Sequence, residues 1–243
     1  MAHKREMKDM IKTINLHAKS YGGGKGIDSR VLYAIEQVPR HNFVAHFPYD
    51  DGPVRIGHGQ TISQPFIVAY MTDMLKLQPL HKVLEIGMGS GYQAAVLSEL
   101  SHEIYTVERI PELAEQTKTL LERLEYNNIK IKVDNGYEGW KEHAPYDRII
   151  VTATANDLIP PQALADQLVE GGKMIIPMKR SAGYEELVLV TKTGTSWMCN
   201  CGKSKKHPLC DGTHKKEGKF KPSKKAKCTE KSLIGVRFVP LVK

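Results

Sequence analysis

The chain has 243 residues, of which 41% are hydrophobic, which is enough for one sizeable α/β domain and a small additional module. No apolar run approaches the length of a transmembrane helix, and the N-terminal MAHKREMKDM lacks the apolar core of a secretory signal. We therefore expect a soluble, cytoplasmic protein with no membrane partner. All four cysteines follow residue 198, which excludes a disulfide framework along the whole chain.

The formal net charge of +8 is concentrated in one segment. Between Cys199 and Lys231 there are 11 lysines and 3 acidic residues, whereas the basic and acidic residues of the remaining chain balance. A basic segment can contact nucleic acid or an acidic partner. This one lacks the aromatic and arginine pattern that supports base recognition, so a solvated lysine-rich loop is the favoured interpretation and nucleic acid is not an expected partner.

The first part of the chain predicts three helices. The helical spacing of Met7, Met10, Ile11 and Ile14 predicts a helix over residues 1–19, which the run YGGGKG ends. Asp28 is the expected N-cap of a second helix that continues to Val38. Ser63 precedes Pro65 and an apolar stripe, and it is the expected N-cap of a third helix. A hydroxyl and free amides at a helix N-terminus also form a seat for a substrate carboxylate, so both roles of Ser63 stay open.

Strands and helices alternate after Pro79. The predicted strands cover residues 82–86, 104–107, 129–133, 146–152, 173–178, 185–192 and 232–241, and the predicted helices cover 92–100, 111–126 and 160–169. This alternation predicts an α/β fold with a doubly wound, mostly parallel sheet. A ligand of such a sheet binds at the carboxyl ends of the strands, where Gly87–Gly91, Glu108 and Asn135 are expected to converge.

The run VLEIGMGSGYQAAVL, residues 83–97, carries the strongest ligand signal of this domain. Glycines between a strand and a helix let the backbone turn sharply and lie against a ligand. Glu108 follows 21 positions after Gly87, at the end of the next strand, where a carboxylate can accept from ribose hydroxyls. The spacing G-x-G-x-G differs from a dinucleotide loop and no P-loop lysine follows; it resembles the S-adenosylmethionine loop of class I methyltransferases.

Several runs of the chain together resemble the protein-L-isoaspartate O-methyltransferase family. They are VLYAIEQVPRHNFV, IGHGQTISQP, VLEIGMGSGYQAAVL, APYDRIIVTATA, IPPQALADQLVEGGKMIIPM and SLIGVRFVPL. The resemblance covers residues 28–194 and 232–242, and IGHGQTISQP is its most specific part. It implies a class I, Rossmann-like methyltransferase that moves a methyl group from S-adenosylmethionine to the free carboxylate of L-isoaspartyl residues in damaged peptides and proteins.

The resemblance also implies roles for individual residues. Ser63 matches the active-site serine. The residues that match the cofactor site are Thr61, Ile62, Glu85, Gly87, Gly89, Ser90, Gly91, Glu108, Arg109, Asn135 and Gly136. Asn135 departs from the family pattern, which has an aspartate near the adenine. An asparagine oxygen can still accept from the adenine amino group, so we expect weaker binding by about 1 kcal/mol rather than its loss.

A second signal interrupts the last pair of strands. Residues 199–214 fit C-x-C-x2-[ST]-x3-P-x-C-D-G-[STA]-H and resemble the CDGSH iron–sulfur domain. The resemblance implies a 2Fe–2S cluster bound by Cys199, Cys201, Cys210 and His214. Three thiolates and one imidazole suit zinc as well, but the close Cys-x-Cys spacing favours the cluster. An insert this small has little core of its own, so the metal is expected to stabilise it, and the insert could also form a homodimer contact.

The expected domains are therefore an N-terminal helical segment over residues 1–78, a cofactor-binding domain over 79–194 and 232–243, and the insert over 195–231. Two alternative functions stay open. One is an iron–sulfur or redox protein on a catalytically weakened methyltransferase scaffold, which Asn135 favours. The other is a class I methyltransferase that acts on a different small carboxylate.

Overall fold

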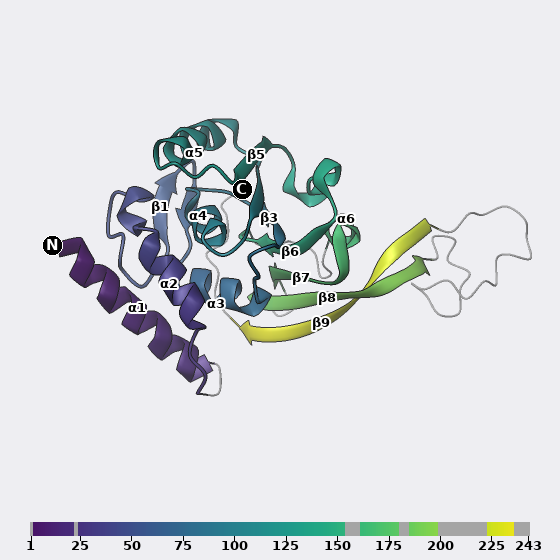
Figure 1. The fold of residues 1–243 in the computed structure, drawn as a ribbon, viewed down its shortest axis with the longest axis horizontal. Coiled ribbons are helices and arrows are strands. Elements are labelled where there is room, and N and C mark those ends of the chain that lie inside the picture. Colours follow the sequence, from purple (N-terminus) through teal and green to yellow (C-terminus); the bar gives the residue numbers. More distant parts are fainter. Residues whose placement is uncertain (1, 22–23, 154–160, 180–184, 199–222, 236–243) are drawn as a thin grey trace, which may run out of the picture.

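The computed structural model describes residues 2–21, 24–153, 161–179, 185–198 and 223–235 (Figure 1). Its helices and strands, in chain order, are α1 (Ala2–Tyr21), α2 (Ser29–Gln37), η1 (Arg40–Asn42), β1 (Val54–Gly57), β2 (Gln60–Ile62), α3 (Pro65–Leu75), β3 (Lys82–Ile86), α4 (Tyr92–Ser98), β4 (Glu103–Glu108), α5 (Pro111–Arg123), β5 (Ile129–Val133), η2 (Gly136–Glu138), η3 (Lys141–His143), β6 (Tyr146–Val151), α6 (Gln162–Asp166), β7 (Leu168–Lys179), β8 (Glu185–Met198) and β9 (Ser223–Gly235).

A central sheet organises the described chain, with strand order β5-β4-β3-β6-β7-β8-β9. The pairs among β5, β4, β3, β6 and β7 are parallel, whereas β7–β8 and β8–β9 are antiparallel. The prediction of a mostly parallel sheet is therefore confirmed. The chain order reverses between β3 and β6, which places the carboxyl end of β3 at the switch point where such sheets bind ligands.

The side chains of β3 alternate between two hydrophobic cores. Val83 packs in the core that also contains buried residues of α1 to α5. Leu84 and Ile86 point to the opposite core, which contains Leu164 of α6. Both faces of the sheet are covered, which explains why β3 reads as a nearly continuous apolar run.

The N-terminal helices form as predicted. Met10, Ile14 and Ala18 are buried along one face of α1, at the spacing of an amphipathic helix. Asp28 is the N-cap of α2, and its Oδ1 accepts from the Arg30 amide at 2.9 Å. None of the helices in the described ranges has the length and the apolar composition needed to cross a membrane.

The predicted boundary between the helix over 160–169 and the following strand is wrong. The helix expected over 160–169 is described only as α6, Gln162–Asp166, and β7 already begins at Leu168 rather than at residue 173. Tyr146 of β6 pairs with Leu168, so the neighbouring strand draws this stretch into the sheet. Gly171 has a φ of +72°, a conformation that glycine adopts easily within an irregular strand.

The C-terminal end of β8 and the N-terminal end of β9 extend further than the sequence predicted. The predicted strand 185–192 continues to Met198, and β9 begins at Ser223 instead of residue 232. Met198 and Ser223 are paired, and Figure 1 shows β8 and β9 reaching beyond the other labelled helices and strands. The predicted metal ligands Cys199, Cys201, Cys210 and His214, and the stretch 236–241 of the predicted last strand, lie outside the described residues.

Candidate active site

The loop between β3 and α4, which we call the glycine loop (Gly87–Gly91), has three glycines with positive φ. The angles are +94° at Gly87, +54° at Gly89 and +83° at Gly91, all unfavourable for other residues. A Cβ on Gly87 would lie 2.7 Å from the Thr152 hydroxyl oxygen, and a Cβ on Gly91 would lie 2.7 Å from Cγ2 of Thr117. Both backbone conformation and close packing therefore require glycine here.

Two threonine hydroxyls fix the carbonyls of the glycine loop. Thr152 Oγ1 donates to the Gly87 carbonyl at 2.5 Å, and Thr117 Oγ1 donates to the Gly89 carbonyl at 2.7 Å. The sequence interpretation missed both residues. Thr152 follows the end of β6, and this position at the carboxyl end of a strand is a weak indication of a site residue. Nothing in the helical pattern of α5 distinguishes Thr117.

Glu108, at the end of β4, connects the glycine loop to the next turn. Its Oε2 accepts from the Gly89 amide at 3.0 Å, while its Oε1 accepts from the amides of Arg109 and Ile110 at 2.8 and 3.0 Å. A carboxylate has about four acceptor positions, so Oε2 retains one for a ligand hydroxyl. The predicted contact of Glu108 with a ribose hydroxyl stays a prediction, and it would use this remaining acceptor position. Arg109 contributes its amide, and the residue itself is exposed.

Glu85 does not line a ligand surface in this structure. It is 0% exposed, and the Thr106 hydroxyl donates to its Oε2. Its Oε1 has no hydrogen-bond partner among the described residues. Burial raises the pKa of Glu85 to about 8; the Thr106 hydrogen bond acts in the opposite direction and the charge of Glu108 adds to the increase. The carboxyl group is therefore mostly protonated at neutral pH.

This buried acid predicts a specific pH dependence of stability. The folded state retains a proton that the unfolded state releases above the ordinary glutamate pKa of 4.5, so the free energy of unfolding falls as pH rises from 4.5 towards 8. Glu85→Gln cannot ionise, so its melting temperature should rise relative to wild type at about pH 8.5 but much less at about pH 5.5. Thermal melts at both pH values, with Glu103→Gln on the same sheet as the control, measure this; a constant difference between Glu85→Gln and wild type would contradict it.

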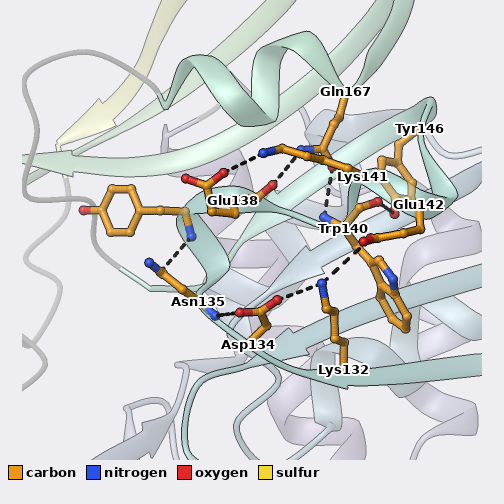
Figure 2. A network of polar contacts seen from close by, with 10 residues as sticks. Lys132, Asp134, Asn135, Glu138, Trp140, Lys141, Glu142, Tyr146 and Gln167 are labelled. Carbon is orange, nitrogen blue, oxygen red and sulfur yellow. Dashed lines mark hydrogen bonds and ion pairs between the residues drawn. The ribbon is translucent and has the colours of Figure 1, made fainter.

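Asn135 and Gly136 lie just after β5, which pairs with β4, and Figure 2 shows Asn135 with its polar contacts. Asn135 is exposed, and its Oδ1 accepts from the Tyr137 amide at 3.2 Å, which caps η2. The Asn135 amide donates to Asp134, whose carboxylate pairs with Lys132 at 2.7 Å. A Cβ on Gly136 would clash with Cγ2 of Ile86, so this turn packs directly against the end of β3.

Gln167 fixes the segment that follows Asn135. Its Nε2 donates to the Glu138 carbonyl at 2.8 Å, and its Oε1 accepts from the Trp140 amide at 2.9 Å (Figure 2). Gln167 is buried, and both ends of its amide are used. The side chain therefore holds the loop that carries Asn135 against the end of α6, a role that the sequence interpretation did not identify.

Ser63 is not the N-cap of α3, so that prediction is wrong. The N-cap is Gln64, which makes no side-chain capping bond, and Pro65 is the first helical residue. Proline restricts its preceding residue to an extended conformation, which places the helix boundary at Gln64. The Ser63 hydroxyl makes no hydrogen bond with the rest of the described chain and is half-buried, whereas its carbonyl accepts from Arg40 Nη2 at 2.7 Å.

Two contacts connect Ser63 and its neighbours with the glycine loop. Thr61 and Ile62 belong to β2, which pairs with β1, and a Cβ on Gly89 would lie 3.5 Å from Cδ1 of Ile56 in β1. Arg40, which binds Ser63, also lies over the ring of Tyr92, 4.8 Å from its centroid. Ser90 Oγ accepts from the Tyr92 amide at 3.4 Å. Arg40 and Tyr92 thus link Ser63 with the end of the glycine loop, whereas Glu85 takes no part in these contacts.

Across the described ranges, no group of three or more histidine, cysteine, aspartate and glutamate side chains is arranged to bind a metal ion. This finding does not concern Cys199, Cys201, Cys210 and His214, which lie outside those ranges.

Comparisons with known proteins identify the family to which the chain is similar. Residues 15–214 match the family model of protein-L-isoaspartate(D-aspartate) O-methyltransferase. A protein-L-isoaspartate O-methyltransferase 2 of Polaromonas is 45% identical over 190 residues, covering 76% of this chain and 89% of the relative. A protein-L-isoaspartate O-methyltransferase 1 of Cupriavidus necator is 47% identical over 243 residues, covering 98% of this chain and 82% of the relative.

A solved structure shows the same architecture. It is a Plasmodium falciparum protein assigned as a protein-L-isoaspartate O-methyltransferase, in complex with S-adenosyl-L-homocysteine. The TM-score is 0.68 at 26% sequence identity, and the match covers 95% of this chain and 97% of that one. By the family match and by the identity to these relatives, the chain belongs to the protein-L-isoaspartate(D-aspartate) O-methyltransferase family.

Proposed function

We propose that this chain transfers the methyl group of S-adenosylmethionine to the free carboxylate of L-isoaspartyl residues in damaged proteins. The observation that carries the proposal is the family match over residues 15–214, within which the glycine loop, Glu108 and Ser63 lie on connected elements. Under this proposal the chain is a protein carboxyl O-methyltransferase that takes part in protein repair.

The residues around the glycine loop fit the methyl donor. The glycines of the loop carry no side chain between the backbone and a ligand, and the remaining acceptor position of Glu108 Oε2 suits a ribose hydroxyl. Asn135 and Gly136 lie at the end of β5, where an adenine ring would be expected. When bound, S-adenosylmethionine supplies a methyl group that its sulfonium sulfur has already activated.

The residues around Ser63 fit a carboxylate acceptor. The Ser63 hydroxyl is uncommitted within the described chain, and the first amides of α3 lack partners inside the helix. These donors would orient one carboxylate oxygen so that the other forms the new bond to the methyl carbon. A carboxylate is already a nucleophile at neutral pH, so the protein's contribution is positioning rather than proton removal. Strong stabilisation of the carboxylate charge would oppose the reaction, since that charge disappears in the transition state.

Transfer of a tritiated methyl group to an isoaspartyl peptide, compared with the same peptide containing ordinary aspartate, tests the proposal. We expect transfer to the isoaspartyl peptide only. No transfer despite bound S-adenosylmethionine would contradict the proposal and would favour the interpretation of a weakened scaffold.

The Ser63→Ala variant should lower kcat/KM for the isoaspartyl peptide by about tenfold, the effect of one hydrogen bond of about 1.4 kcal/mol. Its melting temperature should stay close to that of wild type, because Ser63 caps no helix. Ser98→Ala is a suitable control, since the Ser98 hydroxyl donates to a carbonyl at the far end of α4. A loss of stability without a loss of activity in Ser63→Ala would contradict the assigned role.

We also propose that the segment between β8 and β9 is a CDGSH-type module with a 2Fe–2S cluster bound by Cys199, Cys201, Cys210 and His214. The support is the donor set and its spacing in the sequence. The pairing of Met198 with Ser223 is compatible with a small closed module, because it brings the two ends of the segment together. Dimerisation through this module stays a prediction.

The purified protein should be reddish, with visible absorbance that disappears in Cys210→Ser, because removal of one thiolate ligand destabilises the cluster. Iron and zinc analysis of the same samples distinguishes the two metals. Cys228→Ser, which changes a cysteine outside the motif, should retain the absorbance. A colourless wild-type protein with stoichiometric zinc would contradict the cluster.

A further inference from the structure

Arg40 is a fully buried arginine between the two halves of the active site. It is 0% exposed and belongs to η1. Its Nη2 donates to the Ser63 carbonyl at 2.7 Å, and its guanidinium carbon lies 4.8 Å from the centroid of the Tyr92 ring. Its Nε and Nη1 have no hydrogen-bond partner among the described residues, and neither has the Tyr92 hydroxyl.

Stability does not account for this arrangement. Burial lowers the pKa of Arg40, and the neighbouring Tyr92 offsets only part of the effect. A buried charge that lacks a carboxylate partner is costly, and an apolar side chain of similar volume generally stabilises a core better. No carboxylate forms an ion pair with Arg40 in the part of the chain that the structure describes.

The contacts of Arg40 connect the segments that would hold the two reactants. Ser63 lies immediately before the N-cap of α3, and Tyr92 is the residue directly after Gly91 and the first residue of α4. We infer that Arg40 is a positioning residue that holds Ser63 in register with the glycine loop, so that acceptor and methyl donor are aligned. The inference rests on the proposed function.

Arg40 can act in two ways through the Ser63 carbonyl. The planar guanidinium lies over the Tyr92 ring while it donates to the Ser63 carbonyl, so it fixes the distance between the two. The flexible ammonium of a lysine would fix that distance less well. A charged donor on the carbonyl also polarises the peptide between Ser63 and Gln64, which makes the Gln64 amide a better donor at the start of α3. A shift of about 1 Å between reacting groups can lower a rate by about 100-fold.

The experiment compares Arg40→Met, which retains approximate volume, with Arg40→Lys, which retains charge. We expect kcat/KM for an isoaspartyl peptide to fall by about 100-fold in Arg40→Met and by about tenfold in Arg40→Lys. The affinity for S-adenosylhomocysteine, measured by calorimetry, should change by less than about threefold, because Glu108 and the glycine loop are unaltered.

Thr72→Val is the matched control for a merely structural role. Thr72 is buried, donates to the Val68 carbonyl at 2.7 Å and accepts from Gln93 Nε2 at 2.9 Å, so it connects α3 with α4 without touching Ser63. We expect this variant to lose stability while the kcat/KM of its folded fraction stays within about threefold of wild type.

The outcomes separate this inference from the proposed function. An inactive wild-type chain would overturn both. An active wild type whose folded Arg40→Met variant stays within about threefold of its kcat/KM would overturn the inference alone. The inference would also be overturned if Arg40→Met lost activity and S-adenosylhomocysteine affinity to the same extent, and if both losses followed the fall in melting temperature as they do in Thr72→Val. Should Arg40→Met not fold, Arg40→Lys decides: a loss of about tenfold supports the inference, and wild-type activity overturns it.

Discussion

Glu108→Gln is expected to weaken the binding of S-adenosylhomocysteine by roughly 100-fold, or about 3 kcal/mol. Both carboxylate oxygens of Glu108 accept from backbone amides, Oε2 from Gly89 and Oε1 from Arg109 and Ile110. Glutamine keeps the shape but replaces one acceptor oxygen with an NH2 group. In either orientation of the glutamine side chain, its NH2 group faces a backbone N–H that also donates. The glycine loop or the following turn must therefore move.

Isothermal titration of Glu108→Gln and wild type measures this loss. Glu103→Gln is the control, because Glu103 begins the same strand but pairs with Lys130 at a partly exposed position, and its side chain is far along β4 from the loop. Such a pair contributes only about 0–1 kcal/mol, and it does not touch the site. Equal affinities in Glu108→Gln and wild type would show that the carboxylate neither holds the loop nor binds the ribose.

Features that depend on local pattern could be predicted from the sequence. The apolar run of β3, the glycines and the acidic end of β4 follow each other at short spacing, and the structure joins them through the bond between Glu108 and Gly89. The helical spacing of α1 and the cap of α2 are equally local. In these stretches the propensity of each residue agrees with the fold around it, which is why the prediction was correct.

Features that depend on neighbouring elements could not be predicted in the same way. Leu168 is drawn into β7 by its pairing with Tyr146, although its stretch favours a helix. Glu85 was assigned to the cofactor on the basis of the family motif, whereas the elements packed around β3 leave its side chain 0% exposed and bonded to Thr106 of β4. Ser63 was assigned to the cap because of its residue type, whereas Pro65 fixed the boundary one residue later.

The residues that fix the site from outside its motifs have no sequence pattern of their own. Arg40, Thr117 and Gln167 lie 23, 28 and 29 positions from the backbone groups they bind. An arginine before an apolar run normally indicates a solvated side chain, because buried charges are rare. Only the packing of η1, α3 and α4 around Arg40 shows that its guanidinium is enclosed.

Gly91→Ala is expected to lower the free energy of unfolding by about 3 kcal/mol, which for a chain of this size corresponds to a fall in melting temperature of about 10 °C. Part of the cost arises from the φ of +83° at Gly91, which an L-residue adopts with a penalty of about 1–2 kcal/mol. The remainder arises because the new Cβ would lie 2.7 Å from Cγ2 of Thr117 and 3.3 Å from Cδ1 of Leu121.

The matched control, Gly171→Ala, separates the two contributions. Gly171 has a φ of +72°, but nothing lies within 4 Å of the position that a Cβ would take, so this variant carries the conformational penalty without the clash. It should lose about 1–2 kcal/mol and retain wild-type affinity for S-adenosylhomocysteine. In Gly91→Ala, by contrast, relief of the clash must move either α4 or Thr117, whose hydroxyl holds the Gly89 carbonyl, and ligand affinity should fall about tenfold as well. Equal stabilities of the two variants would mean that Thr117 yields without cost, and that close packing against α5 does not set the position of the glycine loop.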